Sequence, residues 1–243
     1  MNAAEILRCA ESYLARADRL IYSYGSRTFL SGYDLFDAAH GGRGNIDCST
    51  FVLLALAGIP YEASPYGLGS VEAFRSTLPA DGDPIDPALV DFAAMPDRYM
   101  DIAERIGRPY LAGPKGIDLA KAEALGIDLD TLGAEIRASG VRRRSAQIAE
   151  YYADRGACFV DPSAARPGDL VFYRSVGYFT EGERVYPANA EVNHVGIIAR
   201  DTAQMINSTG LGPADAGVSM SPVVGSREPA FFARTGSDDG DPA

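Results

Sequence analysis

Two stretches near the start of the chain have the hydrophobic spacing of helices. Between residues 3 and 21, apolar side chains recur every three or four positions, which predicts an amphipathic helix with one buried face. Residues 51–59 form an apolar run that stops at Gly58 and Pro60, which predicts a short buried helix. The glycines and aromatic residues of 22–44 favour a loop-rich connection between the two helices.

The pattern changes after this second helix. Several prolines break the first part of residues 61–140 into turns and loop. Helical patterns follow at about 88–106 and 118–138, so we expect residues 61–140 to form a helical insertion. A further short helix is predicted at about 145–155, ending at Gly156.

Beyond Gly156 the hydrophobic period becomes two, which is typical of strands with one buried face. Helices followed by a mostly antiparallel sheet predict an α+β architecture. The polar tail, 236–243, is expected to be disordered. The predicted strands are 170–174, 192–199, 204–209, 217–221 and 230–234.

Composition narrows the possible functions. The chain has 243 residues, of which 47% are hydrophobic, as expected for a folded protein. Its net charge of −11 disfavours binding to nucleic acid or to an anionic membrane surface. No apolar run approaches the roughly 18 residues of a membrane span, and the charged N-terminus lacks the apolar core of a signal peptide. We therefore expect a cytoplasmic protein, or one released by lysis or injection.

The three cysteines, Cys9, Cys48 and Cys158, form neither a disulfide framework nor a zinc-binding pattern, so no metal or cofactor is predicted. Cys48 stands out because Asp47, Ser49 and Thr50 beside it are residues that begin helices. A thiol in a first helical turn lies near free amides and the positive end of the helix dipole, which lower its pKa. The alternative is a structural cysteine, since the residue is commonly buried.

A thiol nucleophile needs a base, and histidine is the natural choice. His194 lies in the predicted strand 192–199. If this strand and the next are joined by a four-residue loop at 199–202, Ile198 pairs with Ala203 and His194 lies opposite Asn207, with β-carbons about 5 Å apart. Asn207 could then orient the imidazole. His194 could instead be a half-buried strand residue without catalytic function, and His40, in a glycine-rich loop, is the rival base.

These residues resemble the motifs of the NlpC/P60 family of cysteine peptidases, which have a papain-like fold. The family's Asp-Cys-Ser-Gly-Phe-Val is similar to residues 47–52, its Pro-Gly-Asp-Leu-Val-Phe-Phe to 167–173, its His-Val-Gly-Ile to 194–197 and its Met-Ile-His to 205–207. An Arg-Ser-Ala-Gln at 144–147 resembles the family's linker helix.

The resemblance implies a catalytic domain formed by residues 1–60 and 141–235. Residues 61–140 have no counterpart in the minimal family domain and would form either a cap that narrows the cleft or a surface for self-association.

The resemblance also implies site residues. Cys48 would be the nucleophile, His194 the base and Asn207 the orienting residue, in place of the family's more common histidine. Thr50 replaces the usual glycine beside the nucleophile. The implied substrate-binding residues are Tyr22 or Tyr24, Asp47 and Ser49.

The implied activity is hydrolysis of an amide bond between D-glutamate and a diamino acid in peptidoglycan-derived peptides. The expected partner is a peptide or muropeptide, with no nucleic acid and no membrane, and the oligomeric state stays open. Two alternatives are an amidase or acyltransferase acting on a small γ-glutamyl compound, and a catalytically inactive binding module.

Overall fold

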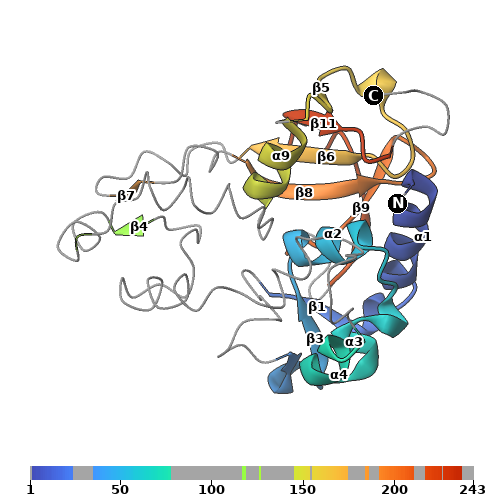
Figure 1. Ribbon diagram of the computed structural model, residues 1–243, viewed down its shortest axis with the longest axis vertical. Coiled ribbons are helices and arrows are strands. Elements are labelled where there is room, and N and C mark those ends of the chain that lie inside the picture. Colours follow the sequence, from blue (N-terminus) through green and yellow to red (C-terminus); the bar gives the residue numbers. More distant parts are fainter. Residues whose placement is uncertain are drawn as a thin grey trace.

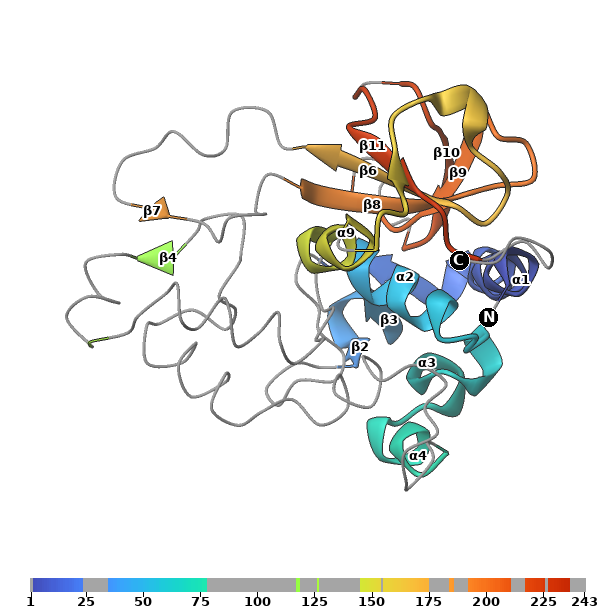
Figure 2. The same ribbon diagram turned by 45° about the horizontal axis from the view of Figure 1, so that its top comes forward.

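Helices cover one face of a six-stranded sheet in an α+β arrangement (Figures 1 and 2). The computed structural model describes residues 2–23, 35–77, 117–118, 126, 145–153, 155–174, 184–185, 192–210, 217–225 and 227–236. The helices of this described part are α1 (Ala3–Leu14), η1 (Ala17–Arg19), η2 (Ala38–His40), α2 (Cys48–Leu56), η3 (Tyr61–Ala63), α3 (Pro65–Leu68), α4 (Val71–Arg75), α9 (Ser145–Ala153) and η4 (Pro162–Ala164).

The large sheet has the strand order β10-β9-β8-β6-β11-β5, and each neighbouring pair is antiparallel. All five strands predicted from the period-two pattern are present, with small differences at their ends. The two-residue strand β5 was not predicted because it is too short to show an alternation. The strands are β5 (Cys158–Phe159), β6 (Leu170–Arg174), β8 (Val192–Ile198), β9 (Gln204–Asn207), β10 (Ser219–Pro222) and β11 (Phe231–Ala233).

The first helix is shorter than predicted. A capping box between Asn2 and Glu5 begins α1, but the helix ends at Leu14 and the chain passes through η1 into strand β1 (Leu20–Tyr22). The prediction of one helix over residues 3–21 was wrong because Leu20 and Ile21 are buried as strand residues, and their spacing happened to fit the helical period.

Strand β1 pairs in parallel with β3 (Arg43–Ile46), which in turn pairs with β2 (Phe36–Asp37). The connection expected to be loop therefore contains a small sheet. This sheet delivers the chain directly to the start of α2.

Helix α2 is the centre of the core, and all nine of its residues are buried. Asp47 begins it: its Oδ1 accepts hydrogen bonds from the Thr50 amide at 2.8 Å and the Ser49 hydroxyl at 2.9 Å. Tyr13 joins α1 to α2 through an edge-on ring contact with Phe51, at 5.8 Å between centroids, and a hydrogen bond to a main-chain carbonyl just beyond the helix. This packing fixes the position of Cys48 in the first turn.

The central strand β8 separates two packed layers because its side chains alternate. Val195 and Ile197 belong to the core that also contains α1, α2 and α9. Ile198 belongs to a smaller cluster, with Tyr173 and Met205, on the other face of the sheet. The Ser145 hydroxyl at the start of α9 donates to the Val192 carbonyl at 3.3 Å, which ties this helix to β8.

The insertion differs from its prediction in two described places. Residues 61–75, expected to be turns and loop, contain η3, α3 and α4. Asp118, expected to begin a helix, lies in β4 (Ile117–Asp118), which pairs with β7 (Arg184–Val185). The predicted helix at 88–106 and almost all of the one at 118–138 lie outside the described residues, as does the tail beyond residue 236.

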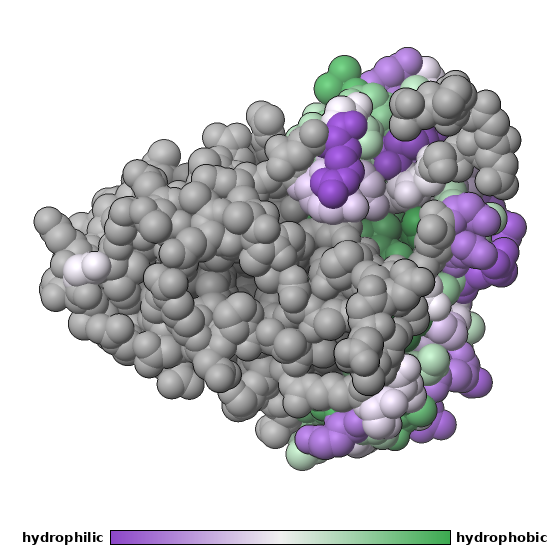
Figure 3. Space-filling view, viewed as in Figure 1, coloured by the Kyte–Doolittle hydropathy of each residue, from purple (hydrophilic) through white to green (hydrophobic). Residues whose placement is uncertain are grey.

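The outer surface of α1 is hydrophilic. On the face shown in Figure 3, strongly hydrophilic side chains gather where α1 lies in Figure 1. In α1, the side chains of Glu5 and Arg8 are 43% and 63% exposed and form a loose ion pair at 3.8 Å. Among the described residues, no helix is both long and apolar enough to cross a membrane.

We predict that Asp47→Ala lowers the free energy of unfolding by about 1–2 kcal/mol, because it removes the helix cap and leaves the Thr50 amide without its acceptor. Asp47→Asn retains an oxygen for that amide and should lose clearly less. Urea denaturation of the two variants and the wild type measures the difference. Equal losses would show that the cap is not the source of the stability.

Candidate active site

The hairpin formed by β8 and β9 differs from its predicted register by two residues. Ile198 pairs with Met205, whereas the sequence predicted Ala203 as its partner. The Ala199 amide donates to the Gln204 carbonyl at 3.0 Å, so the loop has the predicted four residues but lies one position further along the chain. Because the difference is an even number, each side chain stays on its predicted face of the sheet.

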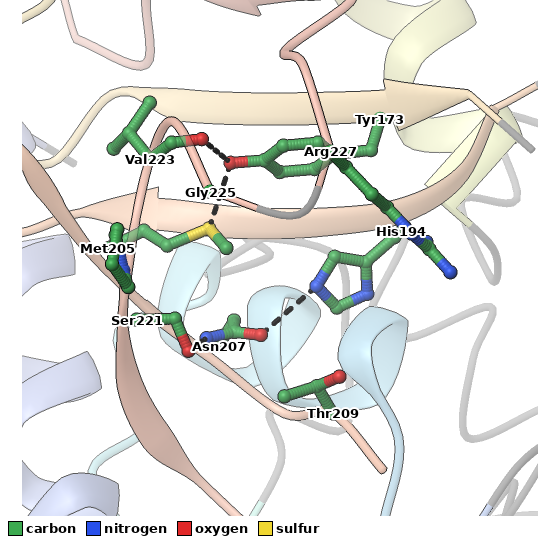
Figure 4. A pocket seen from close by; sticks show the side chains of 10 residues that line it. Tyr173, His194, Met205, Asn207, Thr209, Ser221, Val223, Gly225 and Arg227 are labelled. Atoms are coloured by element: carbon green, nitrogen blue, oxygen red, sulfur yellow. Dashed lines mark hydrogen bonds between the residues drawn. The ribbon is translucent and has the colours of Figure 1, made fainter. Parts of the chain in front are cut away.

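His194 and Asn207 therefore share one face, as predicted, but as diagonal neighbours and not directly opposite each other. His194 Nε2 lies 3.0 Å from Asn207 Oδ1 (Figure 4). Continuing the observed register by one residue puts Gly196 opposite Asn207. A β-carbon at Gly196 would be 3.2 Å from the Asn207 β-carbon and 2.8 Å from the Met205 sulfur, so glycine leaves the space in which the amide leans toward the imidazole.

Strand β10 fixes the orientation of the Asn207 amide. Its Nδ2 donates to the Ser219 carbonyl at 3.3 Å and to the Ser221 hydroxyl at 3.1 Å, and the side chain is buried. With the nitrogen so engaged, the amide oxygen faces the imidazole and accepts. Nε2 of a neutral His194 is then the donor, and Nδ1 is the proton acceptor.

The Cys48 sulfur lies among three backbone amides. The amides of Cys48 and Ser49 belong to the first turn of α2, and the third belongs to Val195 in β8. Val195 follows His194 directly in the chain. The start of the helix thus meets the strand that carries the imidazole.

The direction in which the β8 amides point explains why the Val195 amide is not part of the pairing between β8 and β9. The amides of alternate residues in an antiparallel strand point to the same neighbour, and that of Ala199 points to β9. The Val195 amide therefore points to the β9 side as well. The recorded pairing of β8 with β9 ends at Ile197 and Ile206, however, so the ladder stops before Val195. The Val195 amide faces the Cys48 sulfur instead.

The chain that leaves β9 turns toward the segment before α2. The Ser208 hydroxyl donates to the Ile46 carbonyl at 3.1 Å, two residues before Cys48. The start of α2 consequently lies in the fork between β8 and the chain after β9. Of the predicted catalytic residues, the structure brings His194 and Asn207 into hydrogen bonding and places the Cys48 sulfur against the backbone next to His194.

The expected lowering of the Cys48 pKa is wrong for this site. Burial raises the pKa of Cys48 to about 12, and the negative charge of Asp47 adds to the shift. The three amides that face the sulfur act in the opposite direction but do not compensate for the loss of water. Near neutral pH, Cys48 is therefore a protonated thiol.

Burial also lowers the pKa of His194 to about 4. The hydrogen bond with Asn207 opposes this shift, whereas the positive charge of Arg227 contributes to it. Near neutral pH both groups are therefore uncharged, Cys48 as a thiol and His194 as an imidazole. Such a pair can transfer a proton during attack, without an ion pair formed in advance.

A pocket of about 210 Å³ opens beside His194 and Asn207 on the sheet face away from the helices. Figure 4 shows these two side chains with Tyr173 above them and Thr209 below. The Tyr173 hydroxyl donates to the Val223 carbonyl at 2.7 Å, which holds this wall in place. Arg227, between β10 and β11, also lines the pocket. No sequence pattern indicates a role for Arg227, because a single arginine in a loop has no informative spacing.

The predicted substrate-binding residues that the structure describes lie in two different places, Tyr22 in the small sheet and Asp47 and Ser49 at the start of α2. Tyr22 pairs with Ile46 between β1 and β3, and its ring lies so close to Gly210 that a β-carbon there would be 2.9 Å away. Tyr24 lies outside the described residues. Asp47 and Ser49 are buried and bonded to each other at the helix start, so the structure gives them a capping role, and their contact with substrate stays a prediction.

His40 is placed differently from His194. It ends η2, its side chain is 45% exposed, and its Nδ1 lies 2.9 Å from an Asp37 carboxylate oxygen. The structure records this carboxylate, and not the Cys48 thiol, as the partner of His40.

Comparison of the chain with protein-family models, with curated proteins and with solved structures finds no match in any of the three. The described residues contain no group of three or more histidine, cysteine or acidic side chains suited to a metal ion. The resemblance to NlpC/P60 enzymes thus rests on the sequence motifs alone.

We predict that iodoacetamide alkylates Cys48 slowly at pH 7 and about tenfold faster for each unit of pH up to 9, because a thiol with a raised pKa gains thiolate throughout this range. Peptide mapping by mass spectrometry separates Cys48 from the other two thiols. A rate that levels off below pH 8 would instead indicate a thiolate already formed near neutrality.

Protonation of His194 should also affect stability. The unfolded chain binds a proton at this residue near pH 6.5, and the folded chain only near pH 4, so the free energy of unfolding should fall as pH decreases between these values. His194→Asn should have a flatter profile in this window. Identical slopes for His194→Asn and the wild type would contradict the prediction.

Proposed function

We propose that the protein is a cysteine hydrolase with a papain-like NlpC/P60 core that cleaves an amide bond in peptidoglycan-derived peptides. The observation that carries the proposal is the 3.0 Å hydrogen bond between His194 Nε2 and Asn207 Oδ1, on the strand whose next amide faces the Cys48 sulfur. The proposed chemistry needs three residues that lie far apart in sequence, and it requires the Cys48 sulfur to reach Nδ1 of His194 from the start of α2.

The first half of the reaction forms a thioester. His194 Nδ1 accepts the thiol proton as the Cys48 sulfur bonds to the amide carbon. The carbonyl oxygen gains negative charge, which the Cys48 amide and one further donor would stabilise. The carbon–nitrogen bond then breaks, and His194 returns its proton to the leaving amine.

Water completes the cycle. His194 takes a proton from water as the water oxygen bonds to the thioester carbon, and the carbon–sulfur bond breaks with the proton passing to the sulfur. The net change is one amide and one water converted to a carboxylic acid and an amine. Asn207 keeps Nδ1 aimed at the reacting atoms in both halves.

The substrate class follows from the motif resemblance. We propose γ-D-glutamyl-diamino acid peptides, which are neither polyanionic like nucleic acids nor dependent on a membrane surface. An amine acceptor in place of water would make the protein an acyltransferase through the same thioester, and product analysis with added amines distinguishes the two.

Cys48→Ala should abolish hydrolysis of a γ-D-glutamyl-diaminopimelate peptide, followed by liquid chromatography and mass spectrometry. His194→Ala should slow it by about 10²–10⁴-fold, the usual effect of losing a general base, and Asn207→Ala by less. Cys158→Ala, which removes another free thiol, is the matched control and should keep wild-type activity. Hydrolysis retained by Cys48→Ala would refute the proposal.

A further inference from the structure

Arg227 brings a positive charge to a pocket that is otherwise neutral. Besides His194, the other lining residues are hydroxyl, amide, thioether, aliphatic or glycine, and none is acidic. Arg227 is exposed, so its guanidinium is accessible from solvent. Figure 4 shows its side chain extending toward His194.

The guanidinium has no recorded acidic partner in the described part of the chain. Other described arginines do: Arg200 binds Glu11 with two contacts of 2.6 and 2.8 Å, and Arg234 lies 3.0 Å from Asp169. In a protein with a net charge of −11, acidic residues are plentiful, yet none of those described is paired with Arg227. A guanidinium that has no acidic partner among the described residues and lies beside a pocket is suited to a carboxylate ligand, which it can bind through two parallel hydrogen bonds.

The position of Arg227 indicates that the carboxylate belongs to the amine side of the scissile bond. His194 must pass its proton to the leaving nitrogen, so that nitrogen lies next to the imidazole in the reacting complex. Asn207 occupies one side of the ring, and Figure 4 shows the Arg227 guanidinium on the other side. An anionic group held by Arg227 is therefore close to the leaving nitrogen. In an amino acid, the α-carboxylate is two bonds from that nitrogen.

We propose that Arg227 binds the free α-carboxylate of the leaving amino acid. The substrate class is then an amide whose amine component is a C-terminal amino acid. This inference rests on the proposed hydrolase function and adds to it a specificity for the end of a peptide.

Carboxylate binding would also raise the pKa of His194. The charge of Arg227 disfavours protonation of His194 in the empty site. A bound carboxylate neutralises that charge, so the substrate group that is recognised also makes His194 a better base. A substrate without the carboxylate would lose both effects.

The test uses two substrates, γ-D-glutamyl-diaminopimelate with a free α-carboxylate next to the scissile amide, and the same peptide with that carboxylate converted to a primary amide. We expect the wild type to prefer the free carboxylate by about 10- to 100-fold in kcat/KM, as expected for a charge-assisted pair. Arg227→Gln should lose this preference, mainly through a higher KM, and Arg227→Lys should retain part of it. The amidated peptide should be cut at similar rates by all three proteins.

A pH profile supplies a second readout. Arg227→Gln should move the acid limb of kcat/KM to higher pH, since the charge that lowers the pKa of His194 is gone. Arg16→Gln, which removes an exposed arginine that does not line the pocket, is the matched control and should change neither preference nor profile.

The outcomes separate the two proposals. Hydrolysis by the wild type with equal rates on both peptides, or an equal loss on both in Arg227→Gln, overturns the role of Arg227 and leaves the hydrolase in place. Absence of hydrolysis of either peptide by the wild type overturns the proposed function and this inference with it.

Discussion

The candidate site depends on one interrupted ladder of hydrogen bonds. Where β8 and β9 are paired, their amides and carbonyls satisfy each other and leave no space for another element. Beyond Ile197 and Ile206 the pairing stops, and the Val195 amide turns to the sulfur of Cys48. The buried start of α2 can therefore enter the sheet at this point. A fully paired hairpin would keep the thiol away from the strand that holds the imidazole.

The face on which Asn207 lies could be predicted from the sequence although its exact partner could not. If a loop of fixed length begins one residue later in the chain, the first strand gains a residue and the second strand loses one. Each residue of the first strand then pairs with a residue two positions further along the second strand. The parity of the register then depends on the number of loop residues and not on where the loop begins. The four-residue loop was predicted correctly, and His194 and Asn207 meet across a diagonal for that reason.

Other features depend on contacts that local sequence does not show. Leu20 fits a helical period, yet it belongs to a strand because β3, some twenty residues later, offers a parallel edge. The free amides at the start of α2 are evident from the capping residues, but the desolvation of Cys48 arises from the tertiary packing around it. Arg227 becomes informative only once the fold places it beside His194. The strands and the helix cap were predictable, whereas the pKa of Cys48 and the position of Arg227 were not.

Asp47 has two effects that oppose each other. Its carboxylate secures the first turn of α2, and the same negative charge discourages ionisation of the adjacent sulfur. Peroxides and disulfides react with thiolates far more readily than with thiols. A buried, protonated Cys48 should therefore resist conversion to sulfenic acid or mixed disulfides while the site is empty. The same burial and charge that make the Cys48 thiol less reactive would protect it in oxidising surroundings.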